Sequence, residues 1–209
     1  MQHDFILLDR SQSMHTQWGE ALAAVNGYVA KLAEDKVDTG VTLATFDAPA
    51  GKLVFDVIRD RIIPSTWHKV TDKEAQPRGN TPLNDATGQI VSLAKAGNYD
   101  RVAIIIMTDG AENASKELNV FQARALLDEC RAKGWQVIFL GANFDNAMQA
   151  SSYNNDVNAT MSASRGTFAA HTHSLASKRG LYGVTGQSMT FTDEEKAELN
   201  KNATNATKP

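Results

Sequence analysis

Five oxygen-bearing side chains, spread over three distant segments, have the residue types expected of a site for a hard divalent cation. Asp9, Ser11 and Ser13 form an Asp-x-Ser-x-Ser motif directly after a short apolar run. Thr81 lies in a Gly-Asn-Thr-Pro-Leu segment, and Asp109 follows a second apolar run. Carboxylate and hydroxyl oxygens are the ligands that Mg²⁺ and Mn²⁺ prefer. The sequence therefore predicts one metal site, which requires no residue to transfer a proton or attack a substrate.

The elements around these segments alternate between strand and helix. Short apolar runs are typical of buried strands, whereas apolar stripes with spacings of three and four residues indicate helices. We expect strands at residues 4–9, 41–46, 52–63, 101–107, 135–140 and 157–161. We expect helices at residues 16–34, 81–93, 116–133, 143–151 and 165–178, the second of them with Pro82 at its first helical position.

This alternation favours an α/β fold, in which helices cover both faces of a mostly parallel sheet. Strand 52–63 is expected to run antiparallel to strand 41–46. Ligands of such folds bind beyond the carboxyl ends of the strands, where the strand order reverses. If strands 4–9 and 101–107 are neighbours, Asp9 and Asp109 converge on one crevice.

The three segments together resemble the von Willebrand factor A (vWA) domain. The resemblance rests on Asp-x-Ser-x-Ser after the first strand, on Gly-x-Thr-Pro-Leu, and on Thr-Asp-Gly after a later apolar strand. The flanking residues are similar to small stand-alone members from bacteria and their phages. The resemblance covers residues 1–180 and implies a three-layer, Rossmann-like fold in which the two aspartate-bearing strands are neighbours. It also implies that the five side chains form a metal-ion-dependent adhesion site (MIDAS).

A MIDAS implies a non-enzymatic protein-binding module. In that family a bound Mg²⁺ or Mn²⁺ accepts an Asp or Glu carboxylate from a protein partner. Specificity would then come from residues that flank the ligands on the same loops: Arg10, Gln12, Asn80, Asn84, Glu112 and Asn113. Arg10 has two possible roles, since it can donate a hydrogen bond to the partner's carboxylate or pair with Asp85 or Glu112.

Two other functions remain open from the sequence. A phosphatase of the haloacid dehalogenase type would use Asp9 as nucleophile, but Ser11 occupies the position where that chemistry needs a second aspartate. Alternatively, the protein is an assembly subunit of a larger complex. The family resemblance implies this because intracellular members often work beside AAA+ ATPases and phage-encoded members serve in virions or against host defences. That role would use the same metal site inside a fixed complex.

Composition and charge exclude several classes of partner. The chain has 209 residues and a net charge of −3, and it contains no dense Lys or Arg run, so nucleic-acid binding is not expected. A single cysteine, Cys130, excludes an intrachain disulfide. The first apolar run is too short for a signal-peptide core or a membrane span, so we expect a cytoplasmic protein that does not enter a membrane.

The C-terminal part differs from the rest of the chain. We expect a vWA domain at residues 1–180 and an extension at residues 181–209. Glycines at 180, 183 and 186 are expected to loosen the chain there. Thr192 and Glu195 match a capping box that starts a short helix, and the polar end is expected to be disordered.

Overall fold

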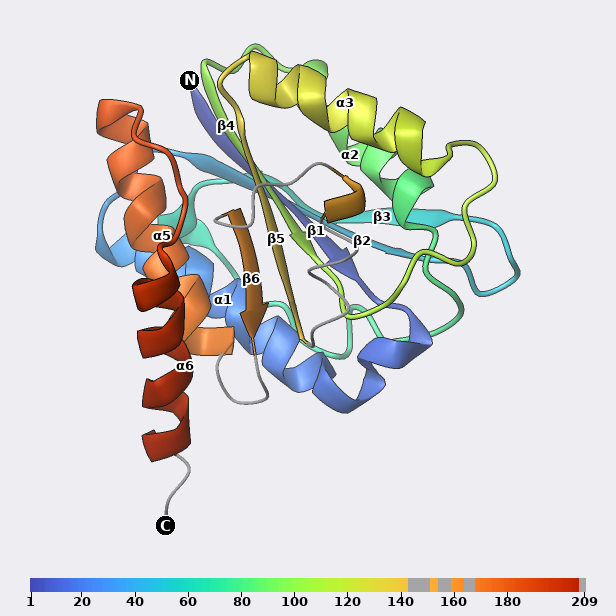
Figure 1. Ribbon diagram of the computed structural model, residues 1–209, viewed down its shortest axis with the longest axis horizontal. Coiled ribbons are helices and arrows are strands. Elements are labelled where there is room, and N and C mark those ends of the chain that lie inside the picture. Colours follow the sequence, from blue (N-terminus) through green and yellow to red (C-terminus); the bar gives the residue numbers. More distant parts are fainter. Residues whose placement is uncertain (143–150, 154–158, 164–167, 207–209) are drawn as a thin grey trace.

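A sheet of six strands forms the middle layer of the computed structural model, which describes residues 1–142, 151–153, 159–163 and 168–206 (Figure 1). The strands are β1 (Gln2–Asp9), β2 (Gly40–Asp47), β3 (Val54–Ile62), β4 (Arg101–Met107), β5 (Gln136–Ala142) and β6 (Thr160–Ala163). Their order is β3-β2-β1-β4-β5-β6, and every pair is parallel except β2 and β3. The strand order reverses between β1 and β4, where a ligand crevice is expected.

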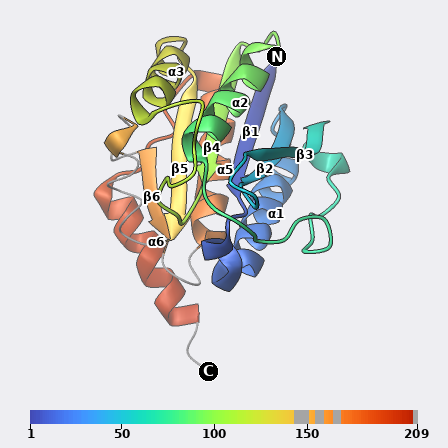
Figure 2. The same cartoon turned by 90° about the vertical axis from the view of Figure 1, so that its right-hand side faces the viewer.

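Helices cover both faces of this sheet, as Figures 1 and 2 show. They are α1 (Trp18–Glu34), α2 (Leu83–Lys95), α3 (Val120–Ala132), α5 (Phe168–Thr185) and α6 (Asp193–Ala206), with short 3-10 helices η1 (Gln12–Gln17) and η2 (Pro64–Thr66). The outer layers are formed by α1 with α5 on one face and by α2 with α3 on the other. Within the described part of the chain, no helix is long and apolar enough to span a membrane.

Alternating side chains of the central strands explain this layering. In β1, Ile6 and Leu8 pack in the core beneath α1, whereas Phe5 and Leu7 pack beneath α2. Every residue of β4 after Arg101 is buried, so this strand is apolar on both faces. Since each fully buried branched or aromatic side chain contributes ~1.5–3 kcal/mol, the two central strands anchor both layers.

The predicted α/β fold and the antiparallel third strand are confirmed. The boundaries of several elements differ. The first helix is split into η1 and α1, and α2 begins at Leu83, so Pro82 precedes the helix instead of occupying its first position. Strand β6 begins at Thr160, and residues 157 and 158 of the predicted strand lie outside the described residues. Most of the predicted helix 143–151 lies outside the described residues.

The predicted loosening after residue 180 is wrong for two of the three glycines, because α5 continues to Thr185. A side chain at Gly183 would collide with Gln2, so glycine permits the close approach of α5 to β1. Gly186 ends the helix in a left-handed conformation with a φ of 77°, and its N–H donates to Tyr182 O. The boundary that we predict between domain and extension stays a prediction. The capping box is present, since Glu195 N donates to Thr192 Oγ1 and Thr192 N donates to Glu195.

A buried ion pair joins α5 to β1. Arg179 Nε donates to Asp4 Oδ1, and both side chains are fully buried. Tyr28 OH donates to the other oxygen of Asp4 at 2.8 Å, and Arg179 also donates to Thr39 Oγ1 at 3.1 Å. Helix α5 is therefore held by polar contacts to β1 and to the segment before β2, and α1 binds the same carboxylate through Tyr28.

Candidate metal centre

The five predicted donors come from three loops at the carboxyl end of the central strands. β1 and β4 are parallel neighbours in which Leu8 lies opposite Met107. Asp9 ends β1 and Asp109 follows β4 by two residues, so both carboxylates lie at the same edge of the sheet. The predicted convergence of these strands is therefore confirmed.

Hydrogen bonds connect the hydroxyl and carboxylate donors. Ser11 Oγ and Ser13 Oγ are 3.0 Å apart, and Ser13 Oγ donates to Asp109 Oδ1 at 2.8 Å. Asp9 Oδ1 accepts from Ser11 N at 2.7 Å. Two of the predicted loops therefore meet at atomic contact.

Gly110 shows where the third loop joins them. A Cβ built on Gly110 would lie 2.8 Å from Thr81 Oγ1, 3.1 Å from Ser13 Oγ and 3.6 Å from Asp9 Oδ2. Oxygens of the loop after β1 and of the Thr81 loop therefore face the space that this glycine leaves in the loop after β4. All five predicted donors thus belong to one constellation of hard oxygens, which fits a small divalent cation and no softer metal. No group of three or more His, Cys, Asp and Glu side chains suited to a metal occurs among the described residues, so hydroxyls must supply part of any ligand set.

Two further residues hold the carboxylates and were not predicted. Thr108 Oγ1 donates to Asp9 Oδ2 at 2.6 Å, and Gln17 Nε2 donates to Asp109 Oδ2. Thr108 belongs to the Thr-Asp-Gly motif, and its place next to Asp109 in that motif is the sequence signal that could have identified it. Gln17 ends η1, and nothing in its sequence context indicates a contact 92 residues away.

Burial raises the pKa of Asp9 to about 6, against hydrogen bonds from Thr108 and Ser11 that lower it. Burial also raises the pKa of Asp109. A buried and a half-buried carboxylate at one site repel each other and lose hydration, so their charged forms are costly without a cation.

These pKa shifts predict that Mg²⁺ affinity falls in acid. A cation competes with the proton on Asp9, so we expect an affinity constant that is nearly constant above pH 7. Below pH 6 it should drop by roughly tenfold per pH unit, as one proton is displaced per ion bound. Calorimetric titrations at pH 5, 6 and 7.5 would measure this. A constant affinity across that range would contradict the raised pKa of Asp9.

The structure corrects the prediction for two rim residues. Arg10 is buried and donates to Asp47 Oδ1 at 3.0 Å and to Asp56 Oδ2 at 2.5 Å, instead of facing a partner or pairing with Asp85 or Glu112. Asn84 is also buried, and its Oδ1 accepts from Tyr153 OH at 2.5 Å.

Glu112 is partly exposed, so its rim role stays a prediction, and its carboxylate also organises the loop. It accepts hydrogen bonds from Asn84 N at 2.8 Å and from Ser115 N at 2.8 Å. Asn113 is exposed, but its Oδ1 accepts from Thr81 N at 2.9 Å. These two residues tie the loop after β4 to the start of α2 and so position Thr81. Gln12 and Asn80 remain exposed beside the site.

Known folds resemble this one over most of the chain. The vWF domain of the type V pili tip protein Mfa5 from Porphyromonas gingivalis has a TM-score of 0.64 at 13% identity, covering 92% of this chain and 98% of its own. The manganese-loaded TRAP protein of Plasmodium vivax has a TM-score of 0.57 at 15% identity, covering 80% of this chain and 70% of its own. Proximal thread matrix protein 1 from the mussel byssus has a TM-score of 0.55 at 14% identity, with coverages of 82% and 45%. At such identities these structures show a shared fold alone.

No curated protein sequence matches this chain. The model of the von Willebrand factor type A domain matches residues 5–181, which include all five oxygen donors and all six strands except the start of β1. The chain therefore belongs to the von Willebrand factor type A domain family.

Proposed function

We propose that this protein is a non-enzymatic binding module whose MIDAS holds Mg²⁺ or Mn²⁺ and recognises a carboxylate of a protein partner. Domains of this family are generally non-enzymatic, and they often mediate protein–protein interaction and metal-dependent adhesion. The observation that carries the proposal is that oxygens of Asp9, Ser13 and Thr81 face Gly110, while Ser11 and Asp109 hydrogen-bond to Ser13. The ligands would be Asp9, Ser11, Ser13, Thr81 and Asp109.

The donor set supports an ion that stays electrophilic. Three of the five donors are neutral hydroxyls, so the protein supplies only two negative charges. A dication at such a site would retain positive charge and could accept an oxygen anion from outside the chain. The manganese-loaded TRAP structure shows a metal in one protein of this fold, which supports either Mg²⁺ or Mn²⁺ here.

Exposed groups at the site support recognition of a protein surface. Ser13, Gln12 and Asn80 are exposed, so a partner's side chain would reach the site across them. Gln12 N donates to Gly79 O at 3.0 Å, so the backbone next to both residues is fixed. The side chains of Gln12 and Asn80 are then the groups that would contact a partner beside the metal.

Affinity capture in Mg²⁺ and in EDTA tests the proposal. Wild type is expected to retain a partner only with metal, and Asp109→Ala is expected to retain none. Asp38→Ala is the matched control, because Asp38 is an exposed aspartate just before β2, at the amino ends of the parallel strands and away from the metal centre at their carboxyl ends. Substituting acidic residues of the captured partner one at a time should then identify the carboxylate that the site recognises.

The assembly-subunit alternative predicts a different outcome. Partners retained in EDTA and by Asp109→Ala would contradict metal-bridged recognition and favour docking through another surface. The phosphatase alternative predicts hydrolysis of a phosphomonoester that is lost in Asp9→Ala. We expect no such hydrolysis, since Ser11 stands where the general acid would be.

A further inference from the structure

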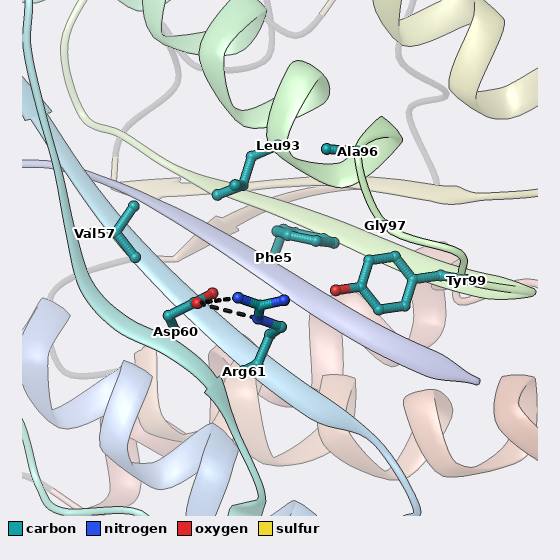
Figure 3. A pocket seen from close by; sticks show the side chains of 8 residues that line it. All are labelled: Phe5, Val57, Asp60, Arg61, Leu93, Ala96, Gly97 and Tyr99. Carbon is teal, nitrogen blue, oxygen red and sulfur yellow. Dashed lines mark hydrogen bonds and ion pairs between the residues drawn. The ribbon is translucent and has the colours of Figure 1, made fainter.

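A second concave site lies on the α2 face of the sheet, near the C-terminal end of that helix (Figure 3). Its volume is about 460 Å³, which is within the usual range of small-molecule sites, roughly 300–1,000 Å³. Phe5 and Val57 contribute from β1 and β3, and Leu93 contributes from α2. Asp60 and Arg61 lie at one side, and Tyr99 closes the other. The metal centre lies at the opposite end of β1 and of α2.

Aromatic rings form a fixed apolar floor in this pocket. Phe5 is buried, and its ring lies edge-on to Tyr99 with ring centroids 5.7 Å apart. His3 packs against both rings, at 4.5 Å from Phe5 and 4.6 Å from Tyr99. Because Phe5 and His3 are buried beside it, they hold the partly exposed ring of Tyr99, which is the aromatic surface that the pocket offers to an apolar group.

The polar side chains of the pocket have unused hydrogen-bond donors but few unused acceptors. Arg61 Nε and Nη2 both donate to Asp60 Oδ2, at 3.0 and 2.9 Å. Asp60 Oδ1 accepts from Thr42 Oγ1 at 3.3 Å, so both oxygens of this carboxylate are engaged. The Arg61 side chain is 67% exposed and keeps its Nη1 donors. The Tyr99 hydroxyl points toward this guanidinium in Figure 3 and has no hydrogen-bond partner among the described residues. The pocket can therefore donate hydrogen bonds to an oxygen acceptor on a ligand.

The backbone is strained at the residue that carries those donors. Arg61 has a φ of 52°, a left-handed conformation that is costly for a residue with a side chain. The β2–β3 register shifts twice nearby, between Val41 and Leu43 and between Leu43 and Ala44. Arg61 N donates to Thr42 Oγ1 at 3.1 Å. This hydrogen bond holds the irregular end of β3 against β2. Irregular edge strands of this kind often re-aim a side chain at a binding site.

We propose that this pocket binds a small organic acid with an apolar, ring-sized body. The ring would lie against Leu93 and the ring of Tyr99, and the carboxylate would accept hydrogen bonds from Arg61 and from the Tyr99 hydroxyl. The same chemistry occurs in a free acid and in the C-terminus of a peptide whose last residue is aromatic. This site is independent of the metal centre.

Titration of the full chain with matched probes tests the proposal by protein-observed NMR. The probes are 3-phenylpropionate, its neutral amide and 3-phenylpropylamine, which share a ring and differ in charge. The acid should shift the amide signals of residues 5, 60, 61 and 97–99 and bind at least about tenfold more tightly than the amide or the amine. A tetrapeptide ending in Phe, used as free acid and as amide, identifies the source: much tighter binding than 3-phenylpropionate assigns the site to a peptide C-terminus.

Two variants locate the carboxylate contact. Arg61→Gln and Tyr99→Phe should each weaken binding of the acid, Arg61→Gln by about tenfold or more, because a charge-assisted hydrogen bond is lost. Tyr99→Phe keeps the aromatic floor, so it separates loss of the hydroxyl from loss of folding. Arg124→Gln on α3 is the matched control, since Arg124 is a partly exposed arginine paired with Asp128, away from the pocket. Equal binding of acid, amide and amine, shifts that map elsewhere, no binding at millimolar concentration, or an unchanged affinity in Arg61→Gln would overturn the proposal.

Discussion

The Asp9→Asn variant is expected to lose at least about 100-fold in Mg²⁺ affinity while its metal-free form becomes more stable than wild type at pH 7.5. Asp9 is fully buried, and burial raises its pKa to about 6. At pH 7.5 the metal-free protein therefore holds a buried carboxylate charge. Replacing it by a neutral amide removes that cost, worth about 1–3 kcal/mol for a pKa that lies roughly two units above its ordinary value.

The size of this stability gain depends on pH. The pKa of Asp9 in the folded, metal-free state is raised, so the folded state binds more protons than the unfolded state between about pH 4 and 6. The contribution of Asp9 to stability is therefore greatest at low pH and declines as pH rises through 6. The stability gain of Asp9→Asn should accordingly be largest at pH 7.5 and disappear near pH 4.

Chemical denaturation with and without Mg²⁺ would measure both effects. Wild type should gain stability as Mg²⁺ is added, whereas Asp9→Asn should not respond. Gly110→Val is a second variant with a different cause, because its side chain would fill the space beside Thr81 Oγ1 and Ser13 Oγ without removing a charge. It should also lose Mg²⁺ binding. Full Mg²⁺ affinity in Asp9→Asn would place the metal elsewhere, and a loss of metal-free stability would contradict the buried-charge argument.

Arg179→Met is expected to destabilise the protein by about 3–5 kcal/mol, since it leaves the buried carboxylate of Asp4 without its charge partner. Arg179 and Asp4 are both fully buried, and Arg179 also donates to Gln2 Oε1 at 2.8 Å. Methionine fills part of the volume of the arginine chain, so the loss is mainly electrostatic. The contact between α5 and β1 should weaken with it.

Urea denaturation at pH 7 would measure the loss, with Lys178→Met as the matched control. Lys178 is the neighbouring residue on α5 and pairs with Glu195 at 2.8 Å, partly exposed to solvent. Exposed pairs contribute ~0–1 kcal/mol, so the control should change stability little. Adding Asp4→Leu to Arg179→Met should restore part of the lost stability, because the unpaired charge is removed. Similar losses for Arg179→Met and Lys178→Met would contradict the role of the buried pair.

The sequence by itself determined the layers of the fold and the donors of the candidate site. Strand and helix are set by local periodicity, and β4 was placed at its observed residues because its apolar run is continuous. The order of the segments and the family resemblance were enough to predict that Asp9 and Asp109 converge. The layers and the donors both depend on short stretches of chain, in which the types of the side chains alone predict the structure.

Only the tertiary structure decided what surrounds those donors. Arg10 flanks the metal motif in sequence, yet it is buried against Asp47, which lies on another strand 37 residues away. Asn84 is turned inward by Tyr153, and Asp4 is paired with Arg179 from the far end of the chain. The pocket beside Arg61 has no sequence motif, because β1, β3, α2 and the segment before β4 each supply one part of it. Local periodicity cannot predict these pairings, since the energy of a polar contact depends on which distant segments meet and on how much water they exclude.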